Sequence, residues 1–149
     1  MKIGVIGSGD VGQVLGSGFL KHGHEVVIGT RDPAKLAAWA KANPQGHVAG
    51  FTEAAKFGEA VVLAVQGAVA TEALAAASAD ALTGKVVIDA TNPIGGAPRN
   101  GVLKFFTNLD DSLMERLQKQ FPMAKFVKAF NSVGSARMVN PDFGGTRPT

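Results

Sequence analysis

Two kinds of segment alternate along the chain. Short apolar runs rich in valine and isoleucine are separated by longer, alanine-rich stretches in which apolar residues recur every three or four positions. The short runs predict strands and the longer stretches predict helices. We expect strands at Lys2–Gly7, Glu25–Gly29, His47–Phe51, Ala60–Val65, Lys85–Ala90 and Lys125–Phe130.

The helices are expected between these strands. Val11, Leu15 and Phe19 fall at helical spacing and would give the first helix an apolar face toward the sheet. Asp32 followed by Pro33 is typical of a helix start, because aspartate caps free N–H groups and proline suits the first turn. The later helices are expected at Pro33–Ala42, Thr52–Phe57, Gly67–Ala81 and Asp111–Gln120.

This alternation predicts the fold class. Strands that alternate with helices form a parallel sheet with helices on both faces. We therefore expect an α/β protein, a Rossmann-type doubly wound parallel sheet in three α/β/α layers. A chain of 149 residues supports one core, so we expect a single domain over residues 1–149. The turn-rich segment 143–149 has no closing element, which leaves open whether the natural protein continues.

A glycine-rich turn directly follows the first predicted strand and opens the first predicted helix. In such a turn the first glycine permits the tight bend, the second lets backbone approach a pyrophosphate, and the third lets helix and strand pack closely. The free N–H groups of the helix start would bind the phosphates. Because a carboxylate repels phosphate, we expect the aspartate of this turn to serve as a helix cap. The turn consists of Gly7, Ser8, Gly9, Asp10, Val11 and Gly12.

The end of the second strand predicts which dinucleotide binds. NAD-binding members of this class place an acidic residue there to bind the adenosine ribose. Here Thr30 takes that place, followed by Arg31 and Lys35. A hydroxyl and two cations suit a 2′-phosphate, so we expect NADP(H) as the cofactor. Asp32 is the competing ribose acid, but it fits better as the helix cap before Pro33.

The composition argues against several classes of protein and of active site. The 15 basic and 12 acidic residues are mixed along the chain, so we expect no nucleic-acid partner. No apolar stretch approaches the roughly 20 residues that span a bilayer, and no signal peptide is recognisable, so we expect no membrane segment and a cytoplasmic location. The lack of cysteine excludes thiolate chemistry and cysteine metal sites, and the lack of tyrosine excludes the Tyr–Lys pair of short-chain dehydrogenases.

Three segments together resemble a known family. Gly7–Gly12, Thr30–Lys35 and Val127–Asn131 resemble the NADP oxidoreductases that depend on coenzyme F420. They are also similar to the cytosolic NADPH-binding domain of the six-transmembrane metalloreductases. The resemblance implies NADPH across the carboxyl ends of the strands and a hydride passed to a small-molecule acceptor, coenzyme F420 or a flavin. The resemblance leaves open whether the protein forms a homodimer.

The resemblance also implies roles for individual residues. The glycine turn would hold the pyrophosphate, and Thr30, Arg31 and Lys35 the 2′-phosphate. Val65 and Gln66 would lie beside a ribose. The nicotinamide end would be formed by Ala129, Phe130 and Asn131.

The remaining candidates are uncharged groups at strand ends. Gln66, Thr91, Asn92 and Asn131 could bind the carboxamide or a ribose, and they could equally be turn and cap residues. Lys128 lies in a predicted buried strand, where such a lysine more often extends its head past the sheet edge than donates a proton. Hydride transfer to a flavin-like ring needs no protein nucleophile, and we assign no catalytic residue.

We therefore predict an NADPH-dependent reductase with a flavin-like or deazaflavin acceptor. The alternative is a non-catalytic NADP(H)-sensing or regulatory module, which the sparse set of acid–base residues would suit. Imine or hydroxyacid reductases share the glycine turn, but they need a large helical second domain that 149 residues cannot supply.

Overall fold

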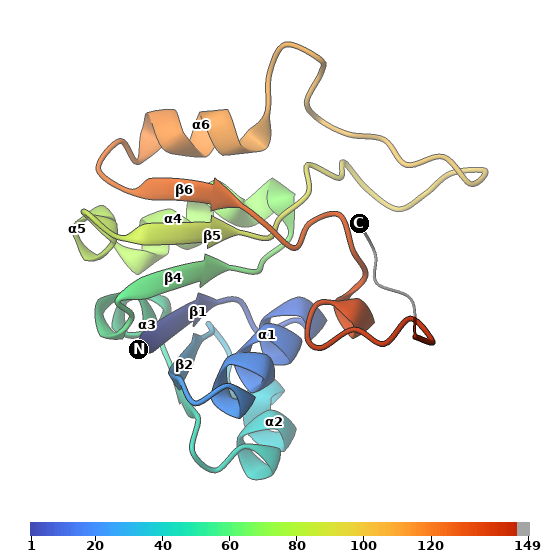
Figure 1. Ribbon diagram of the computed structural model, residues 1–149. Helices are drawn as coiled ribbons and strands as arrows, with labels where there is room; N and C mark the ends of the chain where they lie inside the picture. Colours follow the sequence, from blue (N-terminus) through green and yellow to red (C-terminus); the bar gives the residue numbers. More distant parts are fainter. Residues whose placement is uncertain (146–149) are drawn as a thin grey trace.

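The computed structural model describes residues 1–145, so the last four residues of the turn-rich tail, 146–149, lie outside it. Six parallel strands form one sheet in the order β3-β2-β1-β4-β5-β6 (Figure 1). This is the strand order of the doubly wound dinucleotide-binding fold, and it confirms the predicted fold class. The strands are β1 (Lys2–Ile6), β2 (Glu25–Gly29), β3 (His47–Ala49), β4 (Ala60–Leu63), β5 (Val86–Asp89) and β6 (Lys125–Lys128).

Every predicted strand is present, and most end one or two residues earlier than expected. The predicted helix Gly67–Ala81 is wrong as one element, because Ser78 has a φ of +73° and interrupts it. A 3₁₀ turn at Pro33–Leu36 also precedes α2. The helices are α1 (Asp10–Lys21), α2 (Ala37–Ala42), α3 (Phe51–Phe57), α4 (Ala70–Ala77), α5 (Ala79–Leu82) and α6 (Leu113–Gln120).

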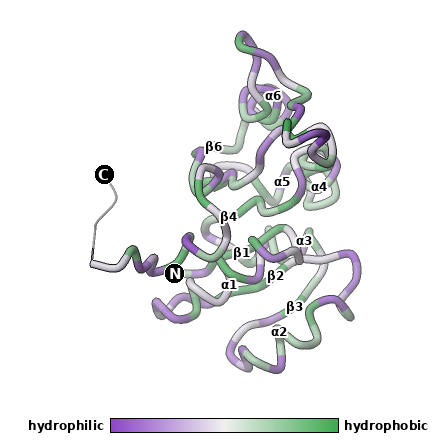
Figure 2. The backbone as a smooth tube through the Cα atoms, turned by 90° about the vertical axis from the view of Figure 1, so that its right-hand side faces the viewer, coloured by the Kyte–Doolittle hydropathy of each residue, from purple (hydrophilic) through white to green (hydrophobic). Residues whose placement is uncertain are grey.

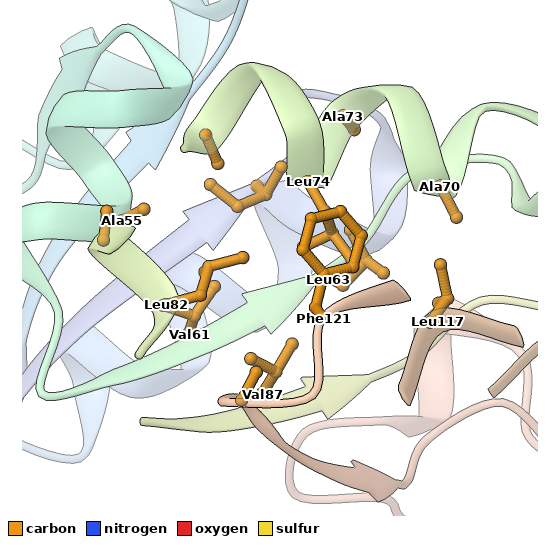
Figure 3. Close-up of a cluster of buried hydrophobic side chains, with 14 of the residues drawn as sticks. Ala55, Val61, Leu63, Ala70, Ala73, Leu74, Leu82, Val87, Leu117 and Phe121 are labelled. Carbon is orange, nitrogen blue, oxygen red and sulfur yellow. The ribbon is translucent and has the colours of Figure 1, made fainter. Parts of the chain in front are cut away.

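Helices cover both faces of the sheet, which gives the three layers. On one face α3, α4, α5 and α6 pack against side chains such as Val61, Leu63 and Val87 (Figure 3). On the other face α1 and α2 pack against alternate side chains of the same strands, such as Val5 and Ile28. Figure 2 views the molecule along the sheet, with β3 and α2 at one end and β6 and α6 at the other. The central strands β1 and β4 are therefore buried on both sides.

Strand β6 differs from the prediction of a buried strand. It is the edge strand of the sheet, and its residues are alternately exposed and half-buried. Helix α6 before it begins with a capping box, in which Ser112 Oγ accepts from the Glu115 N–H at 3.2 Å and the Ser112 N–H donates to the Glu115 carboxylate at 3.0 Å. The Ser112 hydroxyl also donates to this carboxylate at 2.8 Å. These hydrogen bonds from Ser112 hold the pKa of Glu115 below its usual range.

After β6 the chain crosses the carboxyl ends of the strands and returns over α1 (Figure 1). Val139 packs on Gly18 so closely that a Cβ on Gly18 would lie 2.5 Å from a Val139 methyl group. The chain segment after β6 therefore packs against α1 at Gly18. Within residues 1–145, no helix has the length and hydropathy needed to cross a membrane.

Candidate functional site

The glycine turn has the geometry that the sequence predicts. Gly7 has a φ of +130°, and a Cβ there would lie 2.3 Å from the carbonyl oxygen of Ala64. A Cβ on Gly12 would lie 2.1 Å from the carbonyl oxygen of Gly7, so only glycine lets α1 pack so closely on the turn. At Gly9, in contrast, a Cβ would meet nothing within 4 Å. The backbone at Gly9 thus faces open space at the start of α1.

These differences predict opposite effects of two alanine substitutions. We expect Gly12→Ala to lower the Tm by on the order of 5 °C, because the new Cβ would overlap the backbone. Gly9→Ala should leave the Tm unchanged, since Gly9 has an ordinary extended conformation with a φ of −76°. It should weaken NADPH binding, because the methyl group would fill the space in front of the helix. Thermal unfolding and NADPH titration measure both effects, and tight binding by Gly9→Ala would contradict this placement of the phosphates.

The expected role of Asp10 as a helix cap is wrong. Gly9 is the N-cap of α1, and this cap has no side-chain hydrogen bond. The extended conformation of Gly9 starts the helix one residue earlier than a cap at Asp10 would. Asp10 is therefore the first residue of the helix, where a carboxylate still interacts favourably with the helix dipole. Its exposed side chain forms part of the wall of the cavity described next.

A cavity of about 600 Å³ lies over the glycine turn at the carboxyl ends of β1, β2 and β4. Its wall includes most of the predicted pyrophosphate and 2′-phosphate residues. The tip of β2 contributes Thr30, Arg31 and Lys35. Ten of its lining residues are those that the sequence predicts for the cofactor site: Gly7, Ser8, Gly9, Asp10, Val11, Thr30, Arg31, Lys35, Val65 and Gln66.

Thr30 joins the two halves of this cavity. Its side chain is buried, and its hydroxyl lies 3.1 Å from the Ser8 hydroxyl. The same hydroxyl accepts from the N–H of Asp32 at 3.1 Å. Thr30 therefore fixes the tip of β2 against the glycine turn, while the exposed side chains of Arg31 and Lys35 are the cations available to an anion in the cavity.

Asp32 is confirmed as a helix cap. Its carboxylate accepts from the N–H of Ala34 at 3.1 Å and so caps the 3₁₀ turn that begins at Pro33. Asp32 also lines the cavity. Because one carboxylate oxygen already accepts this backbone N–H, the capping role limits how Asp32 can bind a ribose.

Two further cavities adjoin the first one and share lining residues with it. One, of about 260 Å³, continues from Arg31, Phe51, Val65 and Val69 toward α4. The other, of about 590 Å³, shares its inner wall with the first cavity and continues toward β5. The shared residues are Val11, Val65, Gln66 and Ala90. We call the cavity over the glycine turn the inner cavity. The other two are named after the occupants that we propose for them below: the adenine-side cavity toward α4 and the acceptor-side cavity toward β5.

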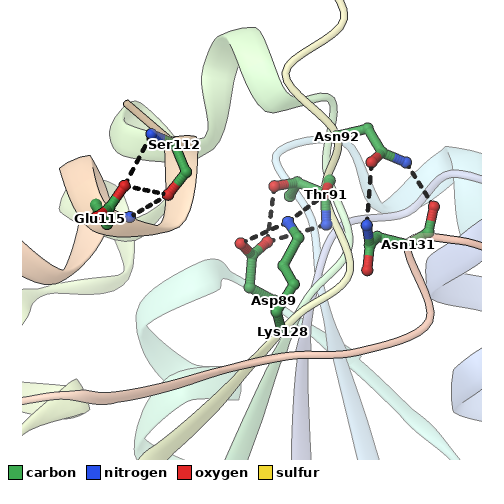
Figure 4. A network of polar contacts seen from close by, with 7 residues as sticks. All are labelled: Asp89, Thr91, Asn92, Ser112, Glu115, Lys128 and Asn131. Carbon is green, nitrogen blue, oxygen red and sulfur yellow. Dashed lines mark hydrogen bonds and ion pairs between the residues drawn. The ribbon is translucent and has the colours of Figure 1, made fainter. Parts of the chain in front are cut away.

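At the end of β5 a buried network of polar groups connects two strands (Figure 4). The carboxylate of Asp89 is fully buried and accepts from the N–H of Thr91 at 2.9 Å and from its hydroxyl at 2.7 Å. Lys128 of β6 completes the network, with Nζ 2.8 Å from Asp89 Oδ2. It also donates to the carbonyl oxygen of Thr91. The expectation that Lys128 extends past the sheet edge is wrong, because the buried carboxylate draws its ammonium group inward.

Asn92 and Asn131 lie side by side beyond this network (Figure 4). Asn92 Nδ2 donates to the carbonyl oxygen of Asn131 at 2.8 Å, and Asn131 Nδ2 donates to Asn92 Oδ1 at 3.3 Å. Asn92 lines the acceptor-side cavity, whereas neither Asn131 nor Ala129 lines any of the three cavities. Ala129 continues the sheet instead, since its N–H donates to the carbonyl oxygen of Asp89.

Sequence reasoning missed several residues of the walls. The sequence predicts Phe51 at the end of a strand, but Phe51 begins α3 and lines the inner and adenine-side cavities. Val69 lines the same two cavities from the 3₁₀ turn before α4. Apolar side chains at helix starts carry no sequence signal that separates a cavity wall from the core. The other missed residues are Ala64 and Ala90 of the inner cavity, Glu72, Ala73 and Ala76 of the adenine-side cavity, and Gly67, Ile94, Gly96 and Ala97 of the acceptor-side cavity.

Comparison with known families shows to which family the chain belongs. Residues 2–93, which include the glycine turn and the tip of β2, match the model of the family described as NADP oxidoreductase, coenzyme F420-dependent. The chain belongs to this family. It is accordingly an oxidoreductase of an NADP-dependent family, and the expectation from the three sequence motifs is confirmed.

Individual members of the F420-dependent NADP oxidoreductase family cover most of this chain. An F420-dependent NADP reductase from Methanothermobacter marburgensis is 30% identical over an alignment of 151 positions, which covers 94% of this chain and 67% of that enzyme. A crystal structure from Arthrobacter sp. FB24, described as an F420-dependent NADP-reductase, superposes on this chain with a TM-score of 0.87 at 40% sequence identity. The superposition covers 95% of this chain and 67% of the Arthrobacter chain. The chain thus spans about two thirds of these two reductases.

Two further proteins are similar to this chain over a smaller part of their own length. The metalloreductase STEAP3 from Rattus norvegicus is 30% identical over 134 residues, 90% of this chain but 25% of that protein. An imine reductase from Myxococcus stipitatus superposes with a TM-score of 0.63 at 20% identity, over 85% of this chain and 39% of that one. This last likeness shows a common fold.

Proposed function

We propose that the chain transfers a hydride between NADPH and a flavin-like or deazaflavin acceptor. The observation that carries the proposal is the continuous series of cavities along the strand ends, from the cations at the tip of β2 to the apolar acceptor-side cavity. The adenine would lie between Arg31 and Phe51, and the 2′-phosphate on Arg31 and Lys35. The pyrophosphate would lie on the glycine turn, and the nicotinamide in the acceptor-side cavity beside Thr91 and Asn92.

The acceptor would bind above the nicotinamide. The acceptor-side cavity is lined by Val11, Val65, Ile94 and the Gly96–Ala97 backbone, with Gln66, Thr91 and Asn92 as its polar groups. An apolar wall with few uncharged hydrogen-bonding groups suits a planar ring held in contact with nicotinamide C4. Since hydride transfer between two such rings needs mainly correct placement, this reaction requires no catalytic acid or base from the chain. A small-molecule acceptor, a homodimer and a cytoplasmic location belong to the same proposal.

NADPH oxidation against a panel of acceptors tests the proposal. The panel would contain coenzyme F420, riboflavin, FMN and a quinone, and the absorbance of reduced nicotinamide would report the oxidation of NADPH. We expect turnover with coenzyme F420 or a flavin and slower oxidation of NADH with the same acceptor. Tight NADPH binding without oxidation by any acceptor would contradict the proposed reaction and favour the NADP(H)-sensing alternative.

A further inference from the structure

The adenine-side cavity contains a charged side chain that the proposed binding of NADPH does not involve. Five of its lining side chains are apolar, and the other two are those of Arg31 and Glu72. The proposed function uses Arg31 for the adenine and the 2′-phosphate. Glu72 is therefore the charged group of this wall whose role is still to be assigned. The full lining consists of Arg31, Phe51, Val65, Val69, Glu72, Ala73 and Ala76.

Glu72 belongs to the first turn of α4, and its position in the wall is well defined. It is three positions from Val69 and four from Ala76, so these residues share one helical face. A hydrogen bond ties this face to α3, because the Thr52 hydroxyl donates to the carbonyl oxygen of Ala76 at 2.8 Å. Phe51, the neighbour of Thr52, lines the same cavity from the start of α3. The hydrogen bond therefore fixes the two helical walls of the cavity relative to each other.

The carboxylate of Glu72 is available to a bound molecule. The residue is exposed, and within residues 1–145 its side chain takes part in no hydrogen bond or ion pair. In the same part of the chain Arg31 forms no ion pair either, so the two charged groups of the wall do not neutralise each other. An ionised carboxylate can only accept hydrogen bonds, so it needs a donor from the ligand.

Adenine supplies one such donor. Its exocyclic N6 amino group donates, whereas its ring nitrogens accept. The faces of the base would contact Arg31 and Phe51, which leaves its edge to the rest of the wall. Among the described residues that line this cavity, Glu72 alone has a side-chain acceptor. The amino group and the carboxylate are thus complementary, and a charged acceptor strengthens the hydrogen bond between them.

We propose that Glu72 selects adenine as the base of the cofactor by accepting a hydrogen bond from its N6 amino group. The inference rests on the proposed function, because it takes the adenine-side cavity as the place of the base. It goes further by assigning recognition of the base to a residue on α4. Arg31 and Lys35 distinguish NADPH from NADH, and Glu72 distinguishes adenine from a purine with a carbonyl group at C6.

The position of Glu72 also has a purely structural explanation, which a control can separate from base recognition. An acidic residue in the first turn of a helix interacts favourably with the helix dipole. This role contributes to stability but gives no preference between two bases. Helix α3 has the same feature in Glu53, which is exposed and lines none of the three cavities. Glu53 is therefore a matched control position.

The reduced form of nicotinamide hypoxanthine dinucleotide phosphate, deamino-NADPH, is the probe. It keeps the 2′-phosphate, the pyrophosphate and the nicotinamide, and it has a carbonyl oxygen in place of the N6 amino group. We expect the unmodified protein to bind NADPH about tenfold more tightly than deamino-NADPH, because this oxygen repels the carboxylate and leaves it without a donor. Titration of the nicotinamide fluorescence measures both affinities.

The variant Glu72→Gln should bind the two nucleotides with nearly equal affinity. The amide has almost the same volume as the carboxylate, and its N–H can donate to the carbonyl oxygen of hypoxanthine. NADPH affinity should fall, because the charged acceptor is lost. The control Glu53→Gln removes the same charge from a helix start and should keep the preference for NADPH.

Three results would overturn base selection by Glu72: equal affinities in the unmodified protein, an unchanged preference in Glu72→Gln, or a lost preference in Glu53→Gln. Oxidation of both nucleotides with the acceptor panel separates this inference from the proposed function. Turnover of both nucleotides with equal affinities would leave the reaction intact and remove the base selection. A preference for NADPH in binding, without oxidation by any acceptor, would keep the base selection and remove the reaction.

Discussion

Replacement of Arg31 by alanine is expected to weaken NADPH binding by about ten- to a hundredfold and to change NADH binding little. A hydrogen bond from a charged donor contributes about 1.5–3 kcal/mol, and each 1.4 kcal/mol is about a factor of ten in affinity. Arg31 is exposed at the tip of β2 and lines both the inner and the adenine-side cavities. Its guanidinium can therefore bind the 2′-phosphate, which NADH lacks.

Titrations of nucleotide fluorescence with both cofactors measure this effect. Lys41→Ala is the matched control, because Lys41 is an exposed cation on α2 that lines none of the described cavities. Lys35→Ala should shift NADPH affinity in the same direction as Arg31→Ala and by less, since a lysine cannot grip phosphate with two parallel hydrogen bonds. Equal losses for NADPH and NADH in Arg31→Ala would contradict the 2′-phosphate assignment.

The sequence was sufficient to predict the features that depend on backbone conformation. Gly7 and Gly12 occupy positions where a Cβ would overlap main-chain atoms, and such positions leave a glycine pattern. Asp32 before Pro33 caps a turn through its own neighbours, so its role is local as well. The fold class followed from the alternation of elements, because a doubly wound sheet is what such an alternation builds.

Features that depend on contacts between distant segments could not be predicted. Phe51 and Val69 meet at one cavity although they belong to different helix starts. Lys128 turns inward because Asp89, 39 positions earlier, is buried beside it. The exposed side of β6 was missed because a strand at the edge of a sheet can carry the same apolar residues as a central one.

The family match covers the predicted cofactor site more fully than the proposed acceptor site. The matched segment, residues 2–93, contains the glycine turn, the tip of β2 and Asn92. Three residues of the acceptor-side cavity, Ile94, Gly96 and Ala97, lie beyond this segment. The family match therefore supports the proposed cofactor site more directly than the proposed place of the acceptor.

Replacement of Lys128 by methionine is expected to lower the free energy of unfolding by about 2–3 kcal/mol. Removing one partner of a buried ion pair leaves a buried charge uncompensated, which typically costs about 3–5 kcal/mol. The side chain of Asp89 has no exposure to solvent, but that of Lys128 is 27% exposed. Because solvent near Lys128 weakens the pair, we place the expected loss below that range.

Urea unfolding of three variants separates the charge effect from simple loss of packing. Lys125→Met, an exposed position on the same strand, should change the unfolding free energy by less than about 0.5 kcal/mol. The double variant Asp89→Asn/Lys128→Met should recover a large part of the loss, since the amide oxygen of the new side chain could still accept from the N–H and hydroxyl of Thr91 without a buried charge. If Lys128→Met were as stable as Lys125→Met, the Asp89–Lys128 pair would not hold the ends of β5 and β6 together.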